Sequence, residues 1–180
     1  MKKETKKQLL IGAALVLELL FLLLYLNGRI DRLLDSDMSS EMILGQLLAR
    51  NNGILSDQWY YSTELRVLNT QLIYALFFRL SSNWHFVRMA STLVLWCVLI
   101  ASYGVLCRVM GCKKSFGVTA LLLAAPVSES YFRFVLAGVY YVPHLAIAFA
   151  ALALNEVYFK AQTDRKKFWL VVSVLLALVA

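Results

Sequence analysis

Charged residues are scarce in this chain. They make up 16% of its 180 residues, whereas about 25% is usual for a soluble domain. Hydrophobic residues make up 61%. A chain this apolar cannot cover itself with polar side chains in water, so we exclude an ordinary soluble domain and expect a protein of the lipid bilayer.

Cysteine is also rare, and its placement excludes the familiar metal sites. Cys97, Cys107 and Cys112 do not stand at metal-ligand spacing with a histidine. We interpret them as small buried hydrophobic residues. The chain also has no internal repeat and no evident pair of broken helices, which disfavours a transporter with Glu18 and His144 in a polar path.

Long, mainly apolar runs replace charged segments; residues 89–107 and 134–155 carry no charge, and 9–26 is apolar apart from Gly12 and Glu18. A helix needs roughly 20 mainly apolar residues to cross a bilayer, and three runs meet or approach that length: 9–26, 89–107 and 134–155. Two shorter runs, 115–128 and 168–180, predict a short or tilted span and an incomplete one. The expected spans are about 8–26, 88–107, 115–131, 134–158 and 168–180.

These spans predict an all-α fold, a polytopic transmembrane helical bundle that forms a single domain over residues 1–180. The last apolar run ends without a polar or basic stop signal. We therefore expect the natural chain to continue, so that these residues are the N-terminal part of a longer protein.

Lysine is missing from one side of the predicted bundle. All nine lysines precede the first span or follow the second and fourth, whereas the other side carries arginine alone. The positive-inside rule places the lysine side in the cytoplasm. We expect a multi-pass protein of the cell (cytoplasmic) membrane with its N-terminus inside, and we interpret the net charge of +7 as an orientation signal with no nucleic-acid partner.

The first outer loop, 27–87, is too long for a plain connection and carries periodic apolar residues. We predict two helices at the membrane surface. The first follows Asp37 and closes near the Asn51-Asn52-Gly53 turn, and the second covers 65–80.

Three carboxylates fall within seven residues at the exit of the first span: Asp35, Asp37 and Glu41. A carboxylate held at the membrane surface can take a proton from an attacking hydroxyl, and two spaced by one residue can share a divalent cation with phosphate oxygens. In the alternative interpretation, Asp37 caps the following helix and Glu41 adds a favourable interaction with the helix dipole.

The order of features resembles the GT-C superfamily of membrane glycosyltransferases, in particular the branch of protein mannosyltransferases and aminoarabinose transferases. The similar part is a basic start, one span, the acidic stretch 35–41, a surface helix to Gly53, a second surface helix, and a run from Asn83 to Arg88 into the next span. It covers about the first 130 residues. The chain departs from the family pattern at Met38, where that branch has a second acid.

The resemblance implies transfer of a sugar from a polyprenyl-phosphate donor to an acceptor hydroxyl of a glycan, lipid or protein on the outer face. Asp37 is then the expected base, with Asp35 or Glu41 in support. From their chemistry we expect Arg88, Arg66 and Arg133 to bind the donor phosphate. A metal requirement stays open. The alternative function is a non-enzymatic assembly or scaffold protein, or an inactive fragment of such an enzyme.

Overall fold

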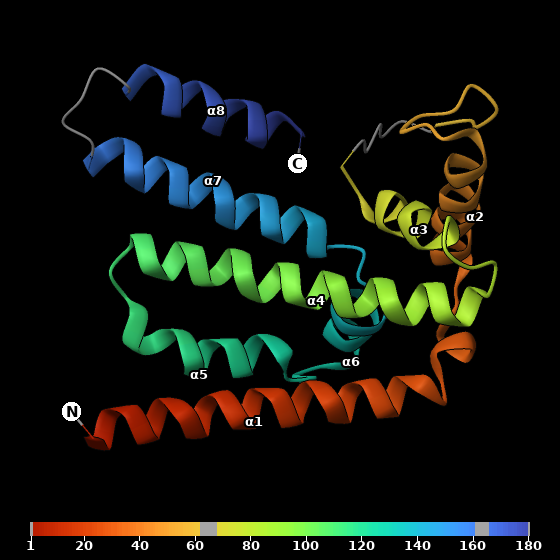
Figure 1. The fold of residues 1–180 in the computed structure, drawn as a ribbon. Coiled ribbons are helices and arrows are strands. Elements are labelled where there is room, and N and C mark those ends of the chain that lie inside the picture. Colours follow the sequence, from red (N-terminus) through yellow and green to blue (C-terminus); the bar gives the residue numbers. More distant parts are fainter. Residues whose placement is uncertain (1, 62–67, 161–165, 180) are drawn as a thin grey trace.

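The structure, a computed structural model, describes residues 2–61, 68–160 and 166–179. In these ranges every regular element is a helix, which confirms the all-α prediction. The bundle consists of helices that lie side by side: α1 (Lys2–Asn27), α4 (Trp84–Val109), α5 (Lys113–Ala124), α7 (Val142–Lys160) and α8 (Lys166–Val179). Two further helices, α2 (Ser36–Asn51) and α3 (Thr70–Phe78), cover one end of it (Figure 1). That is the end at which α1 finishes and α4 and α7 begin.

Among the described residues, three helices are long and apolar enough to cross a membrane: Lys6–Asn27 within α1 (Lys2–Asn27), α4 (Trp84–Val109) and α7 (Val142–Lys160). Leu9 and Leu17 on α1 are 75% and 66% exposed. Leucine in such numbers on an open face is unfavourable in water and favourable against lipid chains. The bundle is therefore that of a membrane protein.

The span predicted at 115–131 is broken in the structure. α5 (Lys113–Ala124) ends one residue before Ala125, which is extended with φ −74° and ψ 136°. Pro126 follows, and a proline disfavours helical backbone in the residue before it. The chain resumes as α6 (Glu129–Tyr131) and the π-helix η2 (Phe132–Ala137), bent from α5 by 90°.

The predicted span at 134–158 also starts later than expected. The first part of that range belongs to η2, and α7 begins only at Val142. Between them Val139 takes a left-handed backbone with φ +54°, which is rare for a β-branched residue. Pro143 then lies in the first turn of α7, where its missing N–H costs no helical hydrogen bond.

A core of leucines joins α1, α4 and η2. Leu22, Leu95 and Leu99 are each 2% exposed, and Leu136 is 1% exposed. The Trp96 indole N–H donates to the Leu136 carbonyl at 2.9 Å. This bond satisfies a carbonyl where the chain leaves regular helical geometry, so the bend is anchored to α4.

The last helix, α8 (Lys166–Val179), runs along α7 (Figure 1). The Ser173 hydroxyl donates to Asn155 Oδ1 at 2.9 Å, and this bond joins the two helices. The predicted last run at 168–180 is thus helical over its described part.

The segment 27–87, predicted as the first outer loop, contains a short 3-10 helix η1 (Ile30–Leu33), then α2 (Ser36–Asn51) and α3 (Thr70–Phe78). Asn52 ends α2 in the left-handed conformation, and the Gly53 N–H bonds back to Leu48, as the turn signal predicted. α3 is shorter than the predicted 65–80; residues 65–67 lie outside the described ranges.

α2 and α3 approach closely at Gly45. A Cβ added there would lie 2.7 Å from Tyr74 Cβ and 3.0 Å from the Gln71 carbonyl oxygen. Only a residue without a side chain allows this approach, and it brings the start of α3 beside the first turns of α2.

Candidate functional site

The first turn of α2 separates the two aspartates. Asp35 is the N-cap, and its Oδ1 accepts from the Met38 N–H at 2.9 Å. An aspartate does cap this helix, as the alternative interpretation predicted, but the capping residue is Asp35 and not Asp37. Asp37 is exposed in the first turn and forms no hydrogen bond or ion pair within the described part of the chain.

Tyr140 connects Asp35 with the loop before α7. Its hydroxyl donates to Asp35 Oδ1 across 105 positions of sequence. Burial raises the pKa of Tyr140 well above its ordinary value, and the hydrogen bond to Asp35 and the charges of Asp37 and Glu41 raise it further. The phenol therefore stays protonated and remains a donor at neutral pH.

Glu41 lies one turn after Asp37 on the same face of α2. Its carboxylate accepts from Asn69 Nδ2 at 3.3 Å and from the Thr70 hydroxyl. Asn69 is 5% exposed and Thr70 is fully buried. The start of α3 thus fixes the orientation of the Glu41 side chain.

A pocket of about 410 Å³ opens beside these residues. Its wall contains the two α2 carboxylates, amides from the start of α3, and aromatic rings from two separate loops. The lining residues are Asp37, Ser40, Glu41, Leu44, Trp59, Tyr60, Tyr61, Asn69, Gln71, Phe134, Tyr140 and Tyr141.

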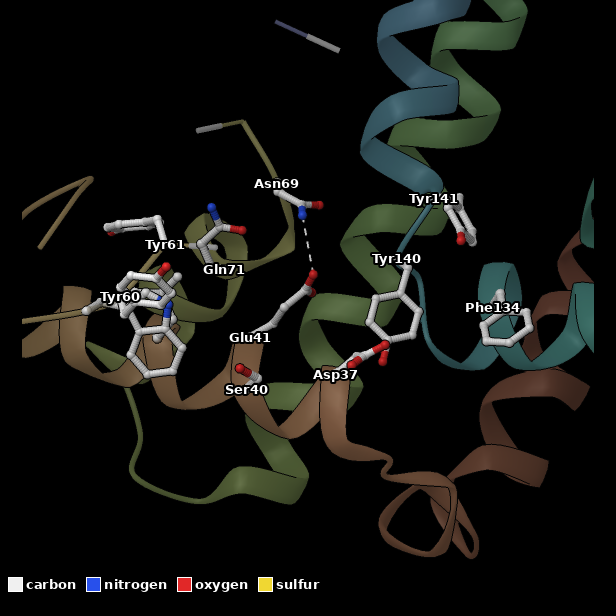
Figure 2. Close-up of a pocket in the computed structure, with 12 residues that line it drawn as sticks. Asp37, Ser40, Glu41, Tyr60, Tyr61, Asn69, Gln71, Phe134, Tyr140 and Tyr141 are labelled. Carbon is white, nitrogen blue, oxygen red and sulfur yellow. Dashed lines mark hydrogen bonds between the residues drawn. The ribbon is translucent and has the colours of Figure 1, made fainter. Parts of the chain in front are cut away.

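Figure 2 shows how these side chains lie. Tyr60 and Tyr61 are on one side, Tyr140 and Tyr141 are on the other, and Glu41 lies between them. Residues from α2, the loop after it, the start of α3 and the segment before α7 therefore share one site.

Two of the arginines predicted to bind phosphate, Arg88 and Arg133, do not line the pocket. Arg88 is 2% exposed, and its guanidinium donates to the carbonyl oxygens of Ile30 and Leu33 and contacts the Met38 sulfur. It holds η1 and the start of α2 against α4. Arg133 is exposed, next in sequence to the lining residue Phe134. Arg66 lies outside the described residues.

Within the described ranges, no three His, Cys, Asp or Glu side chains converge as metal ligands. Asp35, which the spacing allowed to share a cation with Asp37, is instead engaged by Met38 and Tyr140.

Sequence reasoning missed two groups in this site. Tyr140 and Tyr141 stand where a span was expected, and no local signal marks them as part of the pocket. Asn69 falls inside the predicted helix 65–80, whereas in the structure it is the N-cap residue of α3. Asparagine is favoured at N-cap positions, so its residue type is the signal that could have placed the start of the helix there.

Comparison of the chain with protein-family models, with curated protein sequences and with solved structures gives no match.

Proposed function

We propose that this chain belongs to a membrane-embedded glycosyltransferase of GT-C type. It transfers a sugar from a polyprenyl-phosphate donor to an acceptor hydroxyl on the outer face of the membrane. Asp37 is the base.

The observation that carries the proposal is the state of Asp37. Its carboxylate is exposed, forms no hydrogen bond within the described residues, and lines a 410 Å³ pocket. A pocket with aromatic walls and a few convergent polar groups is typical of small-molecule sites. A carboxylate that is not occupied by the protein is available to receive a substrate proton.

The reaction assigned to this site is a single displacement. Asp37 takes the proton from the acceptor hydroxyl, whose oxygen attacks the anomeric carbon of the donor sugar. The bond from that carbon to the phosphate oxygen breaks, and the polyprenyl phosphate leaves with the electron pair. Arg133, exposed beside the pocket residue Phe134, is the described arginine that we assign to the leaving phosphate.

The distribution of charge supports an outer location for the pocket. The described lysines lie at the start of α1, the start of α5, the end of α7 and the start of α8, which is the bundle end opposite α2 and α3 (Figure 1). By the positive-inside rule that end faces the cytoplasm. The α2–α3 end, with its pocket, then faces outward at the membrane surface.

If the chain is instead a scaffold protein, its outer carboxylates should be engaged in interactions that stabilise the fold. Asp35 fits this description as a helix cap. Asp37 does not, because it is not the capping residue and has no hydrogen-bond partner among the described residues. This difference favours the enzyme.

The test is Asp37→Asn, with Asp57→Asn as its matched control. Asp57 is an exposed acid of the same outer segment that does not line the pocket. We expect Asp37→Asn to reduce sugar transfer from a polyprenyl-phosphate donor by roughly 10²- to 10⁴-fold. Membrane abundance of both variants and transfer by Asp57→Asn should stay unchanged. Full transfer by Asp37→Asn would overturn Asp37 as the base.

A further inference from the structure

Two of the three cysteines meet at the turn between α4 and α5. α4 ends at Val109 and α5 begins at Lys113. Between them Gly111 takes a left-handed backbone with φ +78°, which glycine adopts without a steric penalty. The Cys112 N–H then bonds back to the Cys107 carbonyl oxygen at 2.9 Å. This is the Schellman closure of a helix C-terminus.

The closure limits the distance between the two cysteines. Standard backbone dimensions and the 2.9 Å bond from Cys112 N to Cys107 O put their α-carbons at most about 6.8 Å apart. Disulfides join residues whose α-carbons are about 4.4–6.8 Å apart. The backbone of this turn therefore already satisfies the main requirement of a disulfide between Cys107 and Cys112.

The two side chains also lie on the same side of the turn. In a Schellman turn, the residue that donates the closing bond commonly packs against the residue that accepts it. Here the Cys112 sulfur lies 3.5 Å from the Cys107 carbonyl oxygen. Hydrogen bonding with the Cys107 thiol raises the pKa of Cys112 above its ordinary value, and desolvation raises it further. The two thiols are thus neighbours in the folded protein.

The thiols differ in access. Cys107 is 2% exposed, whereas Cys112 is half-buried. A small reagent therefore meets Cys112 first, and Cys107 is placed to complete the reaction as the resolving thiol. Among the described residues, no three His, Cys, Asp or Glu side chains gather as metal ligands, whereas a structural zinc site needs four ligands. The pair is suited to a disulfide.

We propose that Cys107 and Cys112 form a reversible disulfide site, with a low-molecular-weight disulfide as the oxidant. The Cys112 thiolate attacks one sulfur of the small disulfide, whose S–S bond breaks and releases one small thiolate. The Cys107 thiolate then attacks the Cys112 sulfur, and the second small thiolate leaves. Two protein thiols are oxidised, the small disulfide is reduced to two thiols, and those thiols take up the two protons.

The position of the pair indicates when the bond forms. The turn lies at the bundle end opposite α2 and α3 (Figure 1). In the proposed orientation this end faces the cytoplasm, where thiols are kept reduced and disulfides are transient. The bond therefore joins the last turn of α4 to the start of α5 only when small disulfides accumulate. Neither the pair nor its test depends on the proposed function.

Equilibration with glutathione tests the pair in the unmodified chain. The chain in nanodiscs is incubated with reduced and oxidised glutathione at about pH 8 to supply thiolate. It is then quenched with acid, alkylated with N-ethylmaleimide and mapped by mass spectrometry. We expect Cys107 and Cys112 to lose their alkylation together and to regain it with dithiothreitol. Their effective concentration should be about 10 mM or more, since about 1 mM is typical of flexibly linked groups.

An effective concentration at or below about 1 mM would show that the turn does not hold the thiols together. A wild-type chain that stops at a mixed disulfide between Cys112 and glutathione would overturn the proposal in the same way.

Serine variants localise the bond. Cys97→Ser is the matched control, because Cys97 is exposed and lies away from the turn on α4; this variant should form the disulfide like the wild type. Cys107→Ser should stop at the mixed disulfide on Cys112, since no second thiol displaces glutathione. Cys112→Ser should leave the buried Cys107 reduced. Pairing of Cys97 with either residue would contradict the assignment.

Discussion

The helical bundle and the α2–α3 end of the molecule are held together in different ways. In the bundle, residues such as Leu22 and Leu95 pack inward while Leu9 and Leu17 face outward. At the α2–α3 end the buried residues include many polar ones. Those between positions 69 and 92 are Asn69, Thr70, Gln71, Arg88, Ser91 and Thr92.

This difference determines how well each region tolerates substitution. Lipid is as apolar as leucine, so an outward residue of the bundle can change within the apolar class at little cost. A buried polar group without its partner costs about 1–3 kcal/mol. The α2–α3 end therefore depends on particular residues, and four sets of variants test the contrast, beginning with the largest expected effect.

Arg88→Leu should cost the most. It removes a buried charged donor from the carbonyl oxygens of Ile30 and Leu33, and we expect a loss of about 2–4 kcal/mol in the free energy of unfolding. The measurement is unfolding by SDS in mixed micelles. A loss below about 0.5 kcal/mol, the usual range for surface sites, would show that Arg88 does not hold η1 in place.

Gly45→Ala tests the contact between α2 and α3. The new methyl group would meet Tyr74 Cβ at 2.7 Å, so we expect a loss of about 1–3 kcal/mol in the same assay. Gly12→Ala on α1 is the matched control, because nothing lies within 4 Å of the added atom. That variant should be unchanged or up to about 1 kcal/mol more stable. Similar behaviour of the two variants would remove the contrast between the regions.

Tyr140→Phe and Tyr74→Phe make the same chemical change with different consequences. Tyr140 donates to Asp35, and its loss should cost about 1–2 kcal/mol at pH 7. The Tyr74 hydroxyl is buried without a partner among the described residues, so its removal should cost nothing or stabilise the fold. Equal losses for both would contradict the Asp35 bond.

The pKa of Tyr140 adds a pH signature to this pair. Because the folded pKa is raised, the folded protein holds its phenolic proton after the unfolded chain has lost it. The bond therefore contributes fully below about pH 10, the ordinary tyrosine pKa, and its contribution is lost as pH rises above that value. The advantage of the wild type over Tyr140→Phe should be constant from neutral pH to about pH 9 and shrink above pH 10.

Leu17→Ala should have the smallest effect. Leu17 is 66% exposed on the outward face of α1, so no protein cavity forms, and we expect a change within about 0.5 kcal/mol. A loss as large as that of Arg88→Leu would show that a further helix or a second copy covers this face.

Hydropathy predicted the bundle because the bilayer demands long apolar helices. The expected spans at 8–26 and 88–107 coincide with α1 and α4 to within a few residues. The error at 115–131 came from weighing the absence of charge above Pro126, whose effect on Ala125 ends α5. Nothing in the local pattern shows that η2 uses the first residues of the predicted 134–158 span.

The candidate site was predictable only where it is local. Asp37 and Glu41 fall on one face of α2 by helical spacing, and both line the pocket. Arg88 was predicted to bind the donor phosphate. Whether its side chain points to solvent or into the protein depends on the rotation of α4 about its axis, which is set by packing. The contact between Tyr140 and Asp35 joins distant positions, and no spacing rule indicates it.

Val139 gives the fold a further property. A left-handed backbone at a non-glycine residue costs about 1–2 kcal/mol, and here the side chain is fully buried in the leucine core. Its neighbour Tyr140 reaches Asp35. Two consecutive residues thus connect the buried leucine core to the pocket wall through one strained backbone position. A rearrangement of the core at Val139 would therefore also displace Tyr140 from Asp35.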